Sequence, residues 1–182
     1  MNKNERALAK RTKLILSFLK KISDRRPVLK FVDVQECDGK DRMVFTNSYV
    51  GFWLNEDIPE LPHCKDANVG NYPNMVQIYK THSFKANNAD NVRCDVDLAK
   101  LSLAIKTKVE FVSISGVGFD PKMLKLALDV MDTNNVVIEF FKSLDMVCGE
   151  IHIGNNLGYA LLLGARLKED SLANAIDVGV AL

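Results

Sequence analysis

An aspartate followed directly by a proline, Asp120-Pro121, fixes where a helix begins in the second half of the chain. The carboxylate can accept hydrogen bonds from the free amides of the first turn, and the proline ring presets the backbone angle of the first helical residue. Apolar residues then recur at helical spacing until Asn134-Asn135, where we expect the helix to end. The buried face of this helix is predicted to hold Met123, Leu124, Ala127, Leu128 and Met131.

Strands are expected on both sides of this helix. Residues 109–117 alternate in a way that is typical of one strand with a better-buried face. Three apolar segments after the helix are separated by the turn residues Leu144-Asp145 and Gly154-Asn155-Asn156. These segments predict strands near residues 136–141, 146–153 and 158–167.

The first part of the chain has the same order of one helix and three strands. Residues 5–24 carry apolar side chains every three, four and seven positions, which predicts an amphipathic helix that Pro27 ends. Strands are expected at residues 28–37, 42–46 and 49–54, with Asp38-Gly39 as the first turn. The sequence therefore predicts two structural copies of a helix-plus-strands unit.

The segments outside the two copies are less regular. Residues 55–91 hold three of the five prolines and no sustained period, so we expect mostly loop, with a short strand at Met75–Tyr79. Residues 92–105 fit a strand that passes into either a short helix or a second strand. Residues 168–182 form an amphipathic or extended tail that neither copy requires, and the sequence leaves open whether it docks.

Together these patterns predict a single α+β domain over residues 1–167, with a loop-rich insertion at about 55–91. We expect two helices to pack on an antiparallel β layer, because this arrangement buries the apolar side of both elements. A chain of 182 residues, of which 47% are apolar, is long enough to bury one full core.

The predicted first helix carries the clearest functional signal, because its cations gather opposite its apolar side. The chain has 24 basic and 23 acidic residues, so attraction for a polyanion must come from such a local patch. On the second helix Asp129 and Asp132 offset the charge of two lysines. Arg11 projects onto the apolar side, so either the buried part of the helix begins after it or its stem packs while its guanidinium reaches water. The candidate phosphate-contacting residues are Arg6, Lys10, Lys13, Lys20, Lys21, Lys122 and Lys125.

Other residue patterns favour structural roles over chemistry. His63-Cys64 lacks the closely spaced second pair of ligands that zinc sites use. Gly116-Val117-Gly118 lacks the third glycine of a dinucleotide-binding loop, and Trp53 is expected in the core rather than on a stacking platform with Phe52. His63, His82 and His152 show no catalytic spacing, and His152 is expected to point outward from a strand. We therefore expect no metal, no cofactor and no enzymatic activity.

The cysteines and the hydropathy pattern bear on the compartment. The four cysteines lie far apart, and no pair of them forms a closely spaced motif. No apolar run approaches the roughly 20 residues that span a bilayer. We expect a cytoplasmic protein with reduced thiols and no membrane partner.

Short stretches of both copies follow a known pattern. In the second copy they are Phe119-Asp120, Met123-Leu124, Ala127-Leu128, Tyr159 and Leu162-Leu163-Gly164-Ala165-Arg166-Leu167. In the first part of the chain they are Arg26-Pro27-Val28-Leu29, Val32, Asp38-Gly39, Phe45-Thr46-Asn47 and Tyr72-Pro73-Asn74. These stretches resemble the bacterial DNA sliding clamps, the β subunit of DNA polymerase III, and residues 118–167 resemble the final repeat of that family.

The resemblance implies a DNA-clamp-like fold, in which helices line the hole of a ring and pass over DNA phosphates. It also implies a non-enzymatic replication accessory of the processivity type, which contacts the backbone of double-stranded DNA without sequence preference. One chain supplies one such domain, so we expect a homo-oligomer. The expected protein partner is a polymerase or another replication protein, and the expected source is a phage or a mobile element.

Two alternatives stay open. The first is a clamp-fold protein-interaction module that neither closes a ring nor binds DNA, and that binds its partner through sheet edges or the tail. The second is a small-molecule enzyme that uses the loop at residues 55–91. The solution mass, measured together with salt-dependent DNA binding, distinguishes the first of these from the replication accessory.

Overall fold

A computed structural model of the chain describes residues 2–67, 69–85, 91–143, 146–165, 171 and 174–181. Its helices are α1 (Lys3–Leu19), α2 (Met75–Lys85), α3 (Leu98–Lys106) and α4 (Pro121–Met131), with short 3-10 turns η1 (Pro27–Lys30) and η2 (Cys64–Asp66). Its strands are β1 (Asp33–Cys37), β2 (Lys40–Thr46), β3 (Val50–Leu54), β4 (Val92–Val96), β5 (Val112–Ile114), β6 (Val117–Phe119), β7 (Asn135–Ser143), β8 (Met146–Asn155), β9 (Gly158–Leu163), β10 (Ile176–Asp177) and β11 (Gly179–Ala181).

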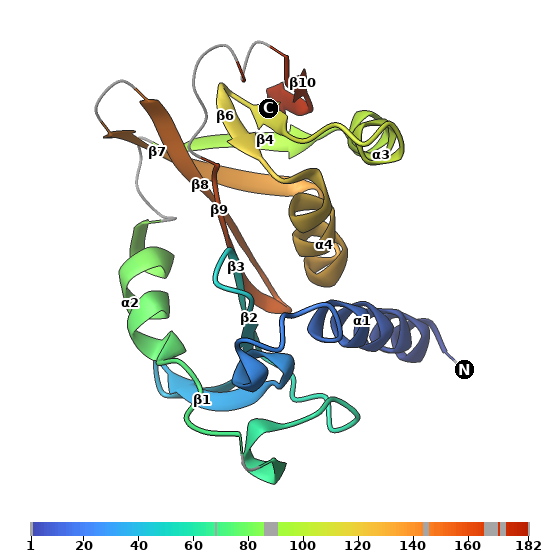
Figure 1. Cartoon of the computed structure of the whole chain (residues 1–182), viewed down its shortest axis with the longest axis vertical. Coiled ribbons are helices and arrows are strands. Elements are labelled where there is room, and N and C mark those ends of the chain that lie inside the picture. The colour runs from blue at the N-terminus through green and yellow to red at the C-terminus, as the bar shows by residue number, and fades with distance from the viewer. Residues whose placement is uncertain are drawn as a thin grey trace.

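The fold is α+β, as the sequence predicts. An antiparallel sheet has the strand order β1-β2-β3-β9-β8-β7-β4-β11, and a smaller sheet has the order β10-β5-β6. Helices α3, α4 and α1 lie in a row on one side of the large sheet, and α2 lies on the other side (Figure 1). We call α1, α3 and α4 the helix layer.

The first copy begins with a helix that is shorter than predicted. Asn2 caps α1, because its side chain accepts from the Glu5 amide and its own amide donates to the Glu5 carboxylate. The helix ends at Leu19 rather than at residue 24, and Pro27 starts η1 instead of ending α1. The strand expected from residue 28 therefore starts only at Asp33, since a proline at the first position of a helical turn favours that turn.

The turns and later strands of the first copy are confirmed. Asp38 and Gly39 have φ angles of 54° and 71°, which is the conformation that a two-residue hairpin turn requires. The turn pairs Cys37 with Lys40 and sets the register of β1 against β2. β2 and β3 lie where the sequence predicts them.

The second copy begins with a hairpin rather than with the single strand expected at residues 109–117. Ser115 and Gly116 have φ angles of 51° and 83° and form the turn between β5 and β6. The predicted cap is confirmed, because Asp120 accepts hydrogen bonds from the amides of Lys122 and Met123 at 2.8 and 3.0 Å. α4 ends at Met131, where the left-handed Asp132 turns the chain before Asn134-Asn135 is reached.

The three strands after α4 are confirmed as β7, β8 and β9. The turn expected at Leu144-Asp145 lies outside the described residues, as do Arg166 and Leu167 of the last predicted strand. Asn155 still pairs with Gly158, so the second turn consists of Asn156 and Leu157.

The two copies join through their last strands. β3 pairs with β9 in antiparallel register, from Val50 opposite Leu162 to Leu54 opposite Gly158. α1 packs beside α4 over this joined sheet. Between helices and sheet lies the larger core, in which Phe45 stacks on Phe52 with their centroids 4.5 Å apart. Two helices therefore lie on one face of one antiparallel layer, as predicted, and α3 adds a third.

The structure distinguishes between the two expectations for the Arg11 side chain. It is buried, and its Nε donates to the Val130 carbonyl at 3.0 Å, while a guanidinium nitrogen lies 3.5 Å from Glu56 Oε2. The stem packs as expected, but the guanidinium binds α4 instead of reaching water.

The largest departure from the sequence prediction lies within residues 55–91. The strand expected at Met75–Tyr79 is wrong, because these residues begin the helix α2. Asn74 Oδ1 accepts from the Gln77 amide, and Met75 and Tyr79, one turn apart, pack on Trp53. The Trp53 indole donates to the Met75 carbonyl at 3.0 Å and attaches α2 to the sheet.

The other uncertain segments are also resolved. Residues 92–105 form a strand followed by a helix, because Asp97 caps α3 through the amides of Ala99 and Lys100. The described end of the tail docks on the domain. β10 pairs with β5, β11 pairs with β4, and Val178 between them is fully buried.

Candidate functional site

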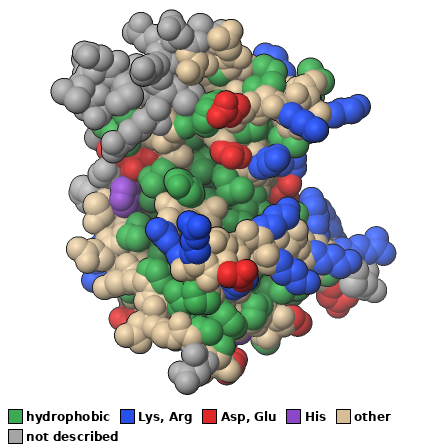
Figure 2. Space-filling model, in the orientation of Figure 1, with side chains coloured by type: hydrophobic (Ala, Val, Ile, Leu, Met, Phe, Trp, Pro, Cys, Tyr) green, Lys and Arg blue, Asp and Glu red, His purple; other side chains and the backbone are tan. Residues whose placement is uncertain are grey.

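The candidate DNA-contacting residues of the first helix are all exposed. Arg6, Lys10 and Lys13 project from α1, whereas Lys20 and Lys21 follow its last residue. Among the described residues, no carboxylate forms an ion pair with any of these five cations. We call these five residues the basic face. Figure 2 shows Lys and Arg side chains gathered over the part of the surface that α1 occupies.

The two candidate lysines of α4 differ from each other. Lys122 is exposed, whereas Lys125 is half-buried and its Nζ lies 2.5 Å from both carboxylate oxygens of Asp129. Because the pair is one helical turn apart, the carboxylate neutralises Lys125 locally. Of the two, only Lys122 presents a free charge to a ligand.

The structure brings three of the seven candidate residues together. A groove of about 460 Å³ between α1 and α4 is lined by Lys21, Lys122 and Lys125, with Ile105 of α3 at its side. Arg6, Lys10 and Lys13 do not line this groove and extend the charge along α1. The arrangement can hold anionic groups of a long polymer.

Sequence reasoning missed the cations of α3. Lys100, Lys106 and Lys108 are exposed on the third helix of the helix layer or directly after it. In residues 92–105 the helical pattern overlaps with strand-like alternation. The sequence therefore did not show that these lysines lie on or next to a helix of the helix layer. The Asp97 cap is the sequence signal that identifies the helix.

Three weaker candidate sites from the sequence occupy positions that favour structural roles. Trp53 and Phe52 are fully buried, so neither forms a stacking platform. Gly116 lies in the β5–β6 turn rather than in a phosphate-binding loop. The Cys64 thiol donates to the Gly70 carbonyl, and among the described residues His63 and Cys64 belong to no group of metal-ligating side chains.

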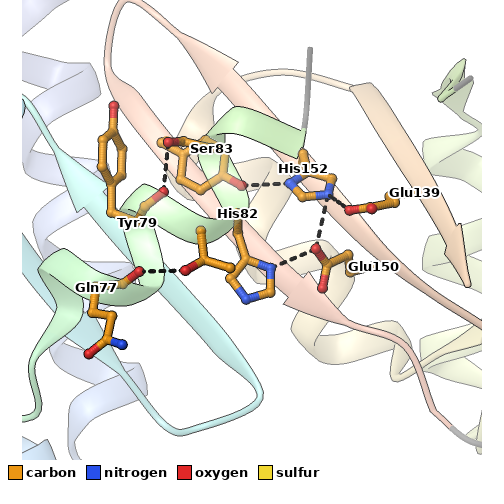
Figure 3. A network of polar contacts seen from close by, with 9 residues as sticks. Gln77, Tyr79, His82, Ser83, Glu139, Glu150 and His152 are labelled. Atoms are coloured by element: carbon orange, nitrogen blue, oxygen red, sulfur yellow. Dashed lines mark hydrogen bonds and ion pairs between the residues drawn. The ribbon is translucent and has the colours of Figure 1, made fainter. Parts of the chain in front are cut away.

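A second cluster, which the sequence did not predict, lies between α2 and the large sheet. His82 of α2 contacts Glu150 of β8 at 2.6 Å (Figure 3). His152 of the same strand contacts Tyr159 of β9 at 2.5 Å. Glu139 of β7 lies 3.5 Å from His152. We call these five residues the polar cluster. The expectation that His152 points outward is wrong, because it is 1% exposed under α2.

Buried charge alters the acidity of the polar cluster. Burial raises the pKa of the Glu150 carboxyl, but the imidazoles of His152 and His82, which lie 3.3 and 2.6 Å from its oxygen, outweigh burial and hold that pKa well below its ordinary value. Burial, together with the charge of Glu150, raises the pKa of the Tyr159 hydroxyl. Glu150 is therefore a carboxylate and Tyr159 a neutral phenol at neutral pH.

Two further findings concern the chain as a whole. Within the described residues, none of the helices combines the length and the apolar character that a membrane crossing requires. No protein-family model matches the chain, and no curated protein or solved structure is detectably similar to it.

Proposed function

We propose that the protein is a non-enzymatic DNA-replication accessory of the sliding-clamp type, which contacts the backbone of double-stranded DNA through the basic face. The observation that carries this proposal is the joining of two helix-plus-strands copies at β3 and β9. This joining sets α1 and α4 side by side on one surface. The clamp-like fold is part of the proposal, supported by the resemblance and by this two-copy arrangement.

The chemistry of the basic face suits phosphate contacts without sequence preference. Lysine and arginine side chains that are exposed and unpaired act as mobile point charges toward phosphates, and they read no base edges. Lys122 adds one cation from α4, and Lys125 contributes less because Asp129 holds it. Binding of this kind releases counterions and weakens steeply as salt rises.

One chain supplies a single pair of copies, so enclosure of a duplex requires several chains. We propose a homo-oligomer in which the helix layer of each subunit faces the DNA. A polymerase or another replication protein is the proposed partner, and a phage or a mobile element is the proposed source.

DNA binding by charge-reversal variants tests the proposal. The test variant changes Lys10, Lys13, Lys20 and Lys21 to Glu. The control variant changes Lys40, Lys65, Lys80 and Arg93 to Glu, which alters the net charge equally but leaves the helix layer intact. Affinity for a labelled duplex of arbitrary sequence is measured by anisotropy between about 50 and 200 mM salt.

We expect the test variant to lose affinity at least about tenfold, with a salt slope shallower by roughly three to four per subunit. The control variant is expected to retain most of the DNA affinity and most of the salt slope. Light scattering after size exclusion should give a mass above that of one chain. A monomer whose DNA affinity is the same in the wild type and the test variant contradicts the proposal.

A protein-interaction module is the second candidate, and one observation favours it. An apolar groove of about 510 Å³ is lined by Tyr49, Phe111, Met123 and Leu163, and Tyr49 is 68% exposed. Such a groove suits a short apolar peptide. A monomeric protein that binds no DNA, but loses binding of an apolar peptide on Tyr49→Ser, would favour this candidate.

A further inference from the structure

The polar cluster places two carboxylates directly opposite each other. Glu139 of β7 pairs in register with Glu150 of β8, and His152 follows two residues later on the same face of β8. One ligand atom from each of these three residues lies within 4.8 Å of the other two. Like charges opposite each other across antiparallel strands repel, so a cation bound between them would stabilise this arrangement.

The His152 imidazole is oriented toward this space (Figure 3). Its Nε2 lies 3.3 Å from Glu150 Oε1 and 3.5 Å from Glu139 Oε2. Within the described part of the chain, this buried nitrogen has no hydrogen-bond partner of good geometry. A buried polar atom without a hydrogen bond costs free energy, and this indicates a ligand that the nitrogen can bind directly.

The other ring nitrogen of His152 fixes the orientation. Nδ1 lies 2.5 Å from the Tyr159 hydroxyl, and in a metal-bound state an Nδ1 proton donated to that oxygen would leave the Nε2 lone pair facing the two carboxylates. His82 holds Glu150 from α2 at 2.6 Å. Partners of this kind orient the ligands in many metal sites.

We propose that Glu139, Glu150 and His152 bind a single divalent transition metal of the zinc class. In a tetrahedral zinc site, ligand atoms about 2.0 Å from the metal lie about 3.3 Å from one another, close to the two His152 distances. The imidazole favours zinc or cobalt over calcium and magnesium, which prefer oxygen ligands throughout. Three protein ligands leave the fourth position to water.

The site would attach α2 to the sheet. Its ligands come from β7 and β8, and the residue that orients Glu150 comes from α2. His82 also lines a cavity of about 260 Å³, together with Trp53 and Leu161. The proposal does not depend on DNA binding, because the polar cluster lies on the opposite side of the sheet from the helix layer.

Metal titration of the full chain tests this site. Protein freed of metal with a chelator is titrated with Zn²⁺ by calorimetry and with Co²⁺ by visible absorption. We expect one equivalent of either metal to bind, and a cobalt spectrum typical of nitrogen and oxygen ligands. Affinity should fall at least about a hundredfold in His152→Gln and Glu139→Gln, and about tenfold to a hundredfold in His82→Ala.

Two variants serve as matched controls. His63→Gln removes another buried histidine, and Cys148→Ser removes a thiol on the same face of β8 as Glu150 and His152. Neither is expected to change metal affinity. Glu139→Gln keeps the test decisive if His152→Gln does not fold, because the Glu139 side chain is partly exposed. Failure to bind either metal at about 100 μM, unchanged affinity in Glu139→Gln, or loss of binding in Cys148→Ser alone would overturn the proposal.

Discussion

The two faces of the large sheet bury their side chains in different ways. Under the helix layer lies an extended apolar core, and apart from Arg11 the charges of α1 remain in water. Under α2 the apolar cluster is smaller, and the ionisable residues Glu150 and His152 are buried with it. A charge in water costs little and stays available to a ligand, whereas a buried charge must be satisfied by its neighbours. The first face therefore suits contact with a polyanion, and the second suits a fixed internal site.

Substitutions at two adjacent residues of β3 test this difference, and they are expected to have the largest effect on stability. Phe52 faces the helix layer and Trp53 faces α2, and both are fully buried. Phe52→Ala removes a ring that stacks on Phe45, so we expect a global loss of about 3–5 kcal/mol in the free energy of unfolding. Urea denaturation measures this loss.

Trp53→Ala should act more locally, because Trp53 anchors α2 through its indole hydrogen bond to Met75. We expect backbone amides of α2 to exchange with solvent much faster, while those of β2 and β9 stay protected. Hydrogen exchange measured residue by residue separates the two variants. Uniform loss of protection in both would show that the faces do not differ in cooperativity.

Replacement of Arg11, the buried cation of the helix layer, is expected to have the next largest effect on stability. Arg11→Met keeps a long apolar stem but removes the hydrogen bond to the Val130 carbonyl and the contact with Glu56. Since hydrogen bonds to charged groups contribute about 1.5–3 kcal/mol, we expect a destabilisation in that range. Lys13→Met, on the exposed side of the same helix, is the control and should change stability by less than about 0.5 kcal/mol. Equal effects of the two variants would contradict the assignment of Arg11 as a link between the copies.

Local sequence signals predicted the parts of the fold that form through neighbouring residues. The Asp120-Pro121 cap, the Asp38-Gly39 turn and the apolar segments that form β7 to β9 each have a local physical cause. These signals also indicated part of the basic face, because helical spacing alone places Arg6, Lys10 and Lys13 on one side of α1. The joining of the copies at β3 and β9 was not predicted, since pairing between distant strands leaves no local pattern.

The α2 face was missed for the same reason. α2 has little amphipathic pattern, and Met75 and Tyr79 become buried only because Trp53 lies opposite them. Without α2 as a cover, Glu150 and His152 look like the outward residues of an alternating strand. Only the register that sets Glu139 opposite Glu150 shows that these charges share one enclosed space.

The smallest expected effect separates direct phosphate contact from general positive charge on the helix layer. Lys125→Ala removes an ion pair with Asp129, so it should cost only about 0.3–0.5 kcal/mol of stability. Both Lys125→Ala and Lys122→Ala remove one positive charge, so the long-range field of the protein changes equally. Only Lys122 is free to displace a counterion from DNA, because the Asp129 carboxylate already holds the Lys125 ammonium. Lys122→Ala should therefore lower the salt slope of DNA binding by about 0.9 per subunit, whereas Lys125→Ala should leave it unchanged. Equal slopes in the two variants would mean that α4 acts on DNA through its net charge alone and that direct contacts are confined to the basic face.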